Sequence, residues 1–217
     1  MKAIIFDMDG VLVDSEIHWK KVESDFLSGL IPSWDETAQK GIIGMSAHDV
    51  YHLLVKEYGL DKSKEEYFGY YQSIAGSIYE EKCSLIQGAK EALLEASTWG
   101  HRVGLASSSP LDWIHMVVNR FSLSQFEVLI SADHVGGRGK PDPGIYLKTA
   151  DSLKVLPANC VAIEDTEKGV ESALRAGMKS VGFRNGFNEG QDLSKAHLII
   201  DGFSNKNMQI IKDTFSL

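Results

Sequence analysis

The chain has 217 residues, of which 43% are hydrophobic and 24% are charged, and its formal net charge is −8. This composition is typical of a globular protein and excludes disorder as the main state, because there is enough apolar material to form a core. The acidic balance argues against nucleic acid as a partner, since phosphate backbones select basic surfaces.

No apolar stretch approaches the roughly 18 residues of a membrane-spanning helix, so we expect no membrane partner. The apolar stretch near the N-terminus stops at Asp7 and is too short for a secretory signal. The two cysteines, Cys83 and Cys160, are far apart and lack the spacing of a metal-binding pair. We therefore expect a reducing cytoplasm as the location, without a disulfide framework.

Short, continuous apolar runs recur along the chain. In order, they cover residues 3–6, 102–106, 127–130, 160–163, 180–183 and 197–200. Runs without alternation are typical of strands that are covered on both faces of a parallel sheet. Helical spacing fills most of the intervals between them, and Gly177 stands where a helix C-cap glycine belongs. The pattern predicts an α/β protein with a doubly wound, Rossmann-like parallel sheet.

The long interval between the first two runs has helical periodicity only. Three apolar stripes with helical spacing pass through it, and they begin at Trp19, Tyr51 and Tyr67. We predict about four helices in this interval, which together form an inserted all-helical cap domain. The predicted domains are the cap, residues 16–82, and a core made of residues 1–15 and 83–217.

Polar side chains stand at the ends of several predicted strands and in one turn between them. They are Asp7, Asp9, Ser107, Ser108, Lys140, Glu164 and Asp165. Ligands of an open parallel sheet bind beyond the carboxyl ends of its strands, so we expect these side chains to meet there. Carboxylates about 4 Å apart repel by roughly 4 kcal/mol per pair at an effective dielectric near 20. Such a cluster needs a hard divalent cation, and its oxygen ligands suit Mg²⁺.

The motifs that carry these residues resemble those of the haloacid dehalogenase superfamily. They read DMDGVLVDSE from Asp7, LASSS from Leu105, GKPDP from Gly139 and IEDT from Ile163. The motifs have the order that the superfamily shows, and they are most similar to its branch of β-phosphoglucomutases and small sugar-phosphate phosphatases. The resemblance implies that the helical insertion is a mobile cap that closes over the site and selects the substrate.

The chemistry of the side chains agrees with the roles that the resemblance implies. Asp7 can attack phosphorus and form an aspartyl-phosphate, while Asp9 can act as general acid and then as general base. Lys140, Ser107 and Ser108 would bind the phosphate oxygens. The implied metal shell contains Asp7, the backbone carbonyl of Asp9, and Asp165. Glu164 would join it through a water molecule, or would instead hold Lys140.

Simpler structural roles remain open for some of these residues. Lys140 could be an exposed turn lysine, and Glu164 and Asp165 could cap the next helix. Ser109 precedes Pro110, and proline is common at the first position of a helix. We therefore expect Ser109 to serve as the helix cap. We expect Ser107, by contrast, to face the phosphate.

Residues 43–49 of the predicted cap resemble a cap loop of β-phosphoglucomutases. We therefore expect the substrate-specificity residues of the cap to be Trp19, Gly44, Ala47 and His48. The chain departs from the mutase pattern at two of these positions, because that pattern has an arginine where Ala47 stands and a histidine where Trp19 stands. Moreover, residues 16–82 contain no arginine, which is the preferred residue for bidentate phosphate recognition. His48 and His52 have helical zinc-site spacing, but the absence of a third ligand in the sequence favours a solvated or half-buried face.

These observations predict a Mg²⁺-dependent phosphatase of small phosphorylated metabolites, with sugar monophosphates as the expected substrates. A phosphomutase of the same fold is the alternative. A non-enzymatic phospho-acceptor switch is a third hypothesis, since response-regulator receivers also combine an acidic pocket with a hydroxyl and a lysine. We expect a monomer or a weak homodimer. The predicted cap carries 12 acidic and 7 basic residues, and we expect its acidic surplus to solvate the outer helix faces.

Overall fold

The computed structural model describes residues 2–217, so Met1, with which the predicted core begins, lies outside the described residues. Six parallel strands form one sheet in the order β3-β2-β1-β4-β5-β6. Their bounds are β1 Ala3–Phe6, β2 Arg102–Ala106, β3 Val128–Ile130, β4 Cys160–Glu164, β5 Lys179–Phe183 and β6 Leu198–Ile200. This order is that of a Rossmann-type sheet and confirms the predicted fold class.

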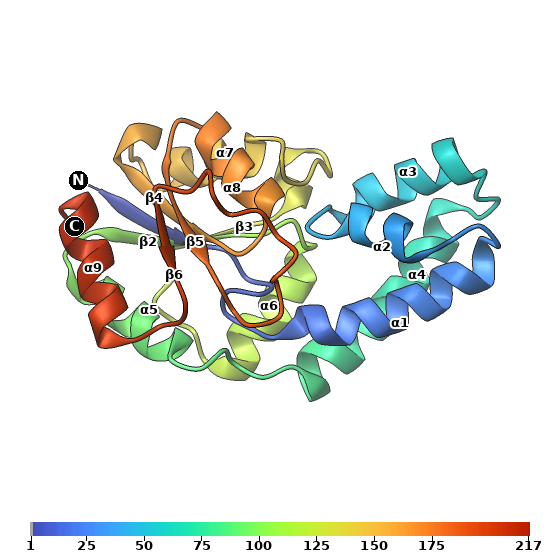
Figure 1. Cartoon of the computed structure of the whole chain (residues 1–217), viewed down its shortest axis with the longest axis horizontal. Coiled ribbons are helices and arrows are strands. Elements are labelled where there is room, and N and C mark those ends of the chain that lie inside the picture. The colour runs from blue at the N-terminus through green and yellow to red at the C-terminus, as the bar shows by residue number, and fades with distance from the viewer. Residues whose placement is uncertain (1) are drawn as a thin grey trace.

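Helices cover both faces of the sheet (Figure 1). One face carries α5 (Ala89–Thr98), α6 (Leu111–Phe121) and α9 (Asn205–Phe215), and the other carries α7 (Gly144–Ser152) and α8 (Glu167–Arg175). The alternation of side chains along β1 explains the two layers. Ile4 and Phe6 pack toward the first group of helices, and Ala3 and Ile5 pack toward the second. The central strand β1 is therefore apolar on both faces, as its continuous apolar run predicted.

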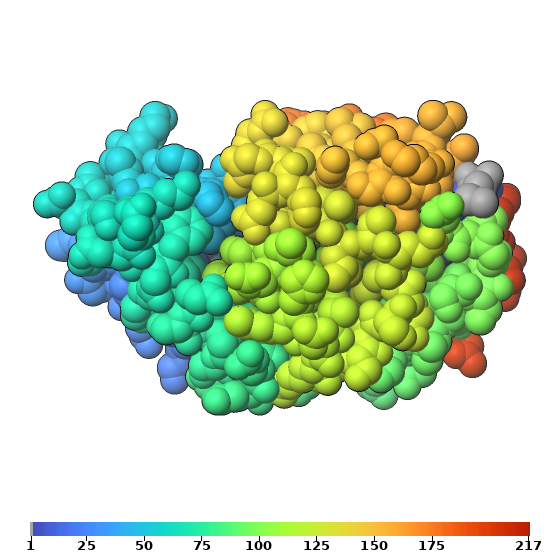
Figure 2. All heavy atoms as spheres, turned by 180° about the vertical axis from the view of Figure 1, so that it is seen from behind, coloured from blue at the N-terminus to red at the C-terminus, as the bar shows by residue number. Residues whose placement is uncertain are grey.

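The interval after β1 folds into helices, as predicted. They are α1 (Ser15–Leu30), α2 (Glu36–Ile42), α3 (Ala47–Tyr58) and α4 (Lys64–Gly76), followed by a π-helical turn, η1 (Ser77–Lys82). Side chains at the N-termini help to start three of them: Asp35 accepts from Ala38 N, Ser46 from Asp49 N, and Ser63 from Glu66 N. These helices form a lobe at one end of the molecule (Figure 2). Residues 16–82 remain our proposed cap domain.

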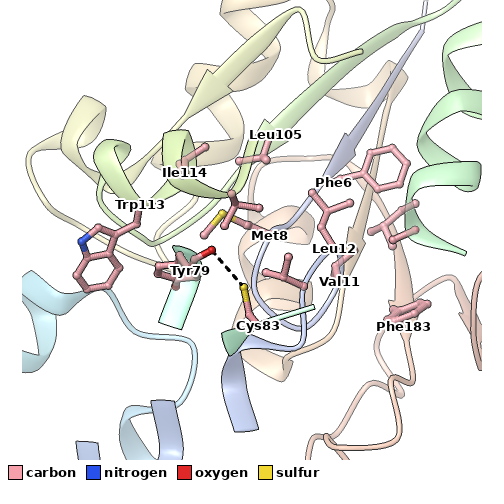
Figure 3. Packing of buried hydrophobic residues seen from close by; sticks show 14 of the residues in the cluster. Phe6, Met8, Val11, Leu12, Tyr79, Cys83, Leu105, Trp113, Ile114 and Phe183 are labelled. Atoms are coloured by element: carbon pink, nitrogen blue, oxygen red, sulfur yellow. Dashed lines mark hydrogen bonds between the residues drawn. The ribbon is translucent and has the colours of Figure 1, made fainter. Parts of the chain in front are cut away.

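Two chain segments join this lobe to the core, and they pack beside each other (Figure 3). The loop after β1 buries Met8 and Leu12 beside Tyr79 and Cys83, at the end of the helical insertion. The backbone of Ile86 donates a hydrogen bond to the Leu12 carbonyl, with an N–O distance of 2.9 Å. The carboxyl edge of β1 therefore lies directly beside the connection to the cap.

The structure describes both cysteines and shows whether its helices could cross a membrane. Cys83 and Cys160 are both free and buried. Between residues 2 and 217, none of the helices combines the length and hydrophobicity that a membrane crossing requires.

Candidate active site

The end of β1 brings two carboxylates to the carboxyl edge of the sheet. The backbone of Asp7 still follows the strand, because its N–H donates to the Ile163 carbonyl at 3.1 Å. The chain then turns at Gly10, whose φ is +77°. A Cβ atom at Gly10 would overlap the Asp165 carboxylate, so both the turn and the close approach require glycine here. The result is a buried Asp7 at the switch point between β1 and β4.

Lys140 is the central cation of the site, and its side chain is only 3% exposed. The Nζ atom lies 2.5 Å from Asp7 Oδ1 and 2.5 Å from Glu164 Oε1, and it donates to the Ala106 carbonyl at 3.0 Å. Burial lowers the pKa of Lys140, but the two carboxylates outweigh burial and hold this pKa above its usual value. The structure therefore places Lys140 inside the site rather than on an exposed turn.

Three buried carboxylates, those of Asp7, Glu164 and Asp165, have ligand oxygens within 4.8 Å of one another. Burial raises the pKa of both Asp7 and Asp165, and neighbouring carboxylates raise these pKa values further. Glu164 Oε1 contacts Lys140 and the Tyr146 hydroxyl, but Glu164 Oε2 and Asp165 Oδ1 are buried without a hydrogen-bond partner. Buried carboxylate oxygens without partners are costly, and a hard cation would satisfy them. This donor set fits a divalent metal ion.

Two asparagines after β5 also orient this acidic cluster. Asn185 Nδ2 donates to Asp165 Oδ2 at 3.0 Å and to the Gly10 carbonyl at 2.8 Å. Asn188 Nδ2 donates to the Asp165 carbonyl at 2.7 Å. Neither asparagine was predicted from the sequence. They follow a predicted strand, so the same rule that selected the other polar strand ends could have found them.

Asp9 accepts hydrogen bonds from three hydroxyl groups. Its Oδ1 atom accepts from Ser15 Oγ at 2.5 Å and from the Tyr79 hydroxyl at 2.7 Å, and its Oδ2 atom accepts from Ser109 Oγ at 2.8 Å. The expectation that Ser109 caps a helix was therefore wrong. The residue that precedes α6 is Pro110, which has no side-chain cap, and the helix backbone at Leu111 donates to Asp133 Oδ2 instead.

The two remaining candidate phosphate ligands lie beside Lys140. Ser107 follows β2, is 1% exposed, and accepts a hydrogen bond from the Ser109 backbone at 3.0 Å. Ser108 Oγ accepts from the Lys140 backbone N–H at 3.1 Å. Both serines line the same cavity as Asp7 and Asp9. Their phosphate-binding role stays a prediction.

A cavity of about 320 Å³ lies between the core site and the helical insertion. Three of the four predicted specificity residues, Trp19, Gly44 and Ala47, line it. Trp19 stacks on Tyr71 and Trp113 at ring-centroid distances of 5.6 and 5.0 Å. His48 is not among the lining residues, and its ring packs against Phe68 at 4.5 Å.

The acidic residues of the cap do not all lie on outer helix faces as we expected, because two of them, Glu16 and Glu23, line the cavity. Glu16, Trp19 and Glu23 share one face of α1, which follows from their spacing of three and four residues. Burial raises the pKa of Glu16 to about 8, and the charges of Asp9 and Glu23 contribute to this rise. The expectation that the acidic surplus solvates outer faces was therefore wrong for Glu16 and Glu23.

Polar contacts also link the insertion to the core at the rim of the cavity. Lys168, on α8, donates to the carbonyls of Gly41 and Ile43 at 2.5 and 3.0 Å. Asp49 Oδ2, on α3, accepts from the Gly139 backbone at 2.6 Å, next to Lys140. These contacts hold the helices over the site.

A Rossmann-type sheet with an acidic site at its switch point, beneath a helical insertion, defines a class of capped α/β proteins. A model of the haloacid dehalogenase-like hydrolase family matches residues 4–183, and the chain belongs to this family. The chain is also similar to hexitol phosphatase B of Escherichia coli (strain K12), which is 34% identical over 182 residues, or 82% of each chain.

Two further relatives cover nearly the whole chain. Beta-phosphoglucomutase of Bacillus subtilis is 28% identical, and the match covers 98% of this chain and 95% of the relative. The crystal structure of β-phosphoglucomutase from Clostridium difficile superposes with a TM-score of 0.80 at 26% identity, covering 100% of this chain and 97% of that one. The predicted resemblance to this branch of the family is confirmed.

Proposed function

We propose that this chain is a Mg²⁺-dependent phosphatase that hydrolyses small phosphorylated metabolites, with sugar monophosphates as the substrate class. The observation that supports this proposal most directly is the contact of Lys140 with Asp7 and Glu164 at the base of the cavity. A cation beside a nucleophilic carboxylate suits the attack of that carboxylate on an anionic phosphoryl group. The names of relatives such as hexitol phosphatase B support the same reaction class.

The proposed reaction has two steps with balanced proton transfers. A carboxylate oxygen of Asp7 attacks phosphorus, the bond from phosphorus to the alcohol oxygen breaks, and Asp9 gives its proton to that oxygen. Asp9 then takes a proton from water, which attacks the aspartyl-phosphate, releases inorganic phosphate and restores Asp7. Lys140, Ser107 and Ser108 bind the oxygens of the transferred group in both steps.

The contacts of Asp9 are compatible with this change of protonation state. All three of its donors are hydroxyl groups, which can accept as well as donate. Asp9 can therefore carry a proton without losing its neighbours, and its orientation toward the cavity is retained. A protonated Asp9 could not keep these contacts if its partners were lysines, because a lysine ammonium group can only donate.

The proposed metal ligands are Asp7, the Asp9 backbone carbonyl and Asp165. Glu164 would act through a water molecule or by holding Lys140. The carboxylates of this cluster are buried, and Glu164 Oε2 and Asp165 Oδ1 have no hydrogen-bond partner, which supports this assignment. The small size of Mg²⁺ suits a site with few protein ligands. When bound, Mg²⁺ would stabilise negative charge on the transferred phosphoryl group.

The charges around the cavity favour a phosphatase over the alternative phosphomutase. Among the described residues that line the cavity, the cations are Lys20 and Lys140, and Lys140 already belongs to the site in the core. Ala47 lines the cavity without a charge, and Glu16 and Glu23 supply carboxylates near it. A second phosphate would meet these acids without an arginine. The similarity to β-phosphoglucomutases keeps the mutase as the second candidate.

The proposal is tested by assaying the purified protein with Mg²⁺ on a panel of sugar monophosphates, following both inorganic phosphate and sugar-phosphate isomers. We expect phosphate release without isomer formation, and we expect Asp7→Asn to lower the rate by at least about 1,000-fold. Asp25→Asn, an exposed change on α1, is the matched control. Isomer formation would establish the mutase, and a phospho-Asp7 that lasts for hours would establish the switch. Full activity of Asp7→Asn would exclude the proposed mechanism.

A further inference from the structure

A chain of hydrogen bonds in the cap ends on one carboxylate that lines the cavity. Trp34 Nε1 donates to Gln39 Oε1 at 2.9 Å, and Gln39 Nε2 donates to Glu23 Oε2 at 2.8 Å. From the other side, the Tyr71 hydroxyl donates to Glu23 Oε1 at 2.7 Å. Trp34, Gln39 and Tyr71 are all buried. These contacts fix the orientation of Glu23.

The partners of Glu23 leave it with unused capacity to accept hydrogen bonds. A carboxylate has about four acceptor sites, and the contacts from Gln39 and Tyr71 use two of them. Both partners are neutral, so they orient the carboxylate without neutralising it by an ion pair. Burial raises the pKa of Glu23, and the hydrogen bonds from Tyr71 and Gln39 oppose this rise, because they stabilise the ionised carboxylate. Glu23 therefore offers the cavity a fixed acceptor, which carries a negative charge when it is ionised.

This acceptor lies at the cap end of the substrate cavity. Glu16 lies seven residues before Glu23 on α1, about two helical turns nearer the core, and the charges of Asp9 and Glu23 both raise its pKa. Between the core and the cap, Trp19 stacks against Trp113 of α6 and Tyr71 of α4 and forms an aromatic wall. A phosphate held by Lys140 would direct the alcohol part of the ester along this wall toward Glu23.

We infer that Glu23 is a specificity residue that accepts hydrogen bonds from hydroxyl groups on the alcohol part of the substrate. This inference rests on the proposed phosphatase function and narrows its substrate class to uncharged, polyhydroxylated alkyl monophosphates. A fixed carboxylate can accept from hydroxyl groups but repels a carboxylate or a second phosphate at the same place. Sites that are built to bind a hydroxyl group discriminate strongly against ligands that lack it.

Two substrates with the same six-carbon skeleton provide a matched test. Sorbitol 6-phosphate has a hydroxymethyl group at the carbon where 6-phosphogluconate has a carboxylate. Affinity is measured by calorimetry with Mg²⁺ in the Asp7→Asn background, so that no turnover is needed. We expect a preference of at least about tenfold for sorbitol 6-phosphate, and we expect Glu23→Gln to reduce that preference by at least about tenfold. Glu57→Gln, at an exposed position on α3, is the matched control and should keep the full preference.

A second variant protects the test against a fold defect in Glu23→Gln. Tyr71→Phe keeps the Glu23 carboxyl group but removes one of its two donors, so we expect a smaller loss of preference. If Glu23→Gln fails to fold, as judged by circular dichroism, Tyr71→Phe decides the question. An unchanged preference in the folded variants would overturn the inference. If the preference follows Glu23 while the wild type releases no phosphate, the inference stands as a binding property and the phosphatase proposal fails.

Discussion

The hydroxyl of Tyr79 donates a 2.7 Å hydrogen bond to Oδ1 of Asp9, and so connects the last turn of the helical insertion to the proposed general acid. The same hydroxyl accepts a hydrogen bond from Trp19 Nε1 at 3.0 Å. Trp19 lines the cavity, so the position of a cap residue is coupled through Tyr79 to the carboxylate that would move the proton. Tyr79 is 1% exposed, which leaves it little freedom to take another position.

This contact predicts that Tyr79→Phe slows the chemical step. The variant keeps the ring among Met8, Trp113 and Cys83 but removes one of the three donors to Asp9. We expect kcat to fall about tenfold while KM changes little, because the loss affects proton transfer more than binding. Tyr70→Phe, at a partly exposed tyrosine on α4, is the control. The pH dependence of kcat is measured for both variants. An equal change in Tyr79→Phe and Tyr70→Phe would contradict a role for Tyr79 in positioning Asp9.

Metal binding should stabilise the folded chain, and Asp165 should be required for this effect. Saturation with Mg²⁺ at about 100 times its Kd stabilises a one-site protein by about 2.7 kcal/mol, so we expect Tm to rise by several degrees. Asp165→Asn removes one buried charge from the cluster with Asp7 and Glu164. In EDTA we expect this variant to melt above the wild type, and Mg²⁺ should no longer shift its Tm.

Calorimetric melting curves with EDTA and with Mg²⁺ provide the measurement for both proteins. Asp112→Asn, on α6 and away from the cluster, is the matched control and should respond to Mg²⁺ like the wild type. A Mg²⁺ shift that survives in Asp165→Asn would show that the ion binds elsewhere.

The elevated pKa of Glu16 predicts a loss of stability with rising pH. This pKa is about 8 in the folded chain, against an ordinary value of 4.5. Between these pH values the folded state keeps a proton that the unfolded state has released, so the free energy of unfolding falls as pH rises. We expect a contribution on the order of 2 kcal/mol, because partial exposure of Glu16 to solvent reduces the full effect.

Glu16→Gln should remove this part of the pH dependence. Urea unfolding in EDTA at pH 5 and pH 8 should show that the variant loses less stability than the wild type between the two conditions. Glu57→Gln, at an exposed position, should behave like the wild type. Equal pH slopes for Glu16→Gln and the wild type would mean that Glu16 titrates normally.

The contacts of Lys168 predict an effect on cap closure. Its ammonium group donates to two carbonyls of the insertion, and burial lowers its pKa. Lys168→Met removes both contacts, so we expect a more open ensemble and a rise in KM of about three- to tenfold. Small-angle scattering should show a larger radius of gyration than for Lys154→Met, a control at an exposed position. An unchanged scattering curve would show that other contacts are sufficient to hold the cap.

The sheet and the acidic cluster could be predicted because their signals are local. The central strands β1, β2 and β4 are continuous apolar runs, since both of their faces are covered, and their polar ends follow directly in the sequence. The boundaries of several strands differ from the prediction by one residue. Glu164, for example, belongs to β4, where it pairs with Gly182. Hydrogen bonding to the neighbouring strand, rather than hydropathy, decides these ends.

The missed residues depend on contacts between distant segments. Tyr79 reaches Asp9 across 70 positions of sequence, and its own stretch of sequence shows only an amphipathic helix. Ser109 has a suitable place before a helix, yet its hydroxyl contacts Asp9, because the end of β2 lies beside the end of β1. Glu23 was overlooked for a different reason. Its spacing from Trp19 was visible, but acidic residues on a helix are usually solvated, and only the packing of α4 buries this one.

The stacking of Trp19 on Trp113 has a spectroscopic consequence. The two indole rings lie 5.0 Å apart at an interplanar angle of 24°, and they belong to α1 of the insertion and α6 of the core. Indoles at such a distance couple their electronic transitions, so we expect the pair to contribute its own signal to the near-ultraviolet circular dichroism. Any separation of the insertion from the core would weaken that coupling. The chain thus contains an intrinsic optical probe of the position of the insertion relative to the core, without a label.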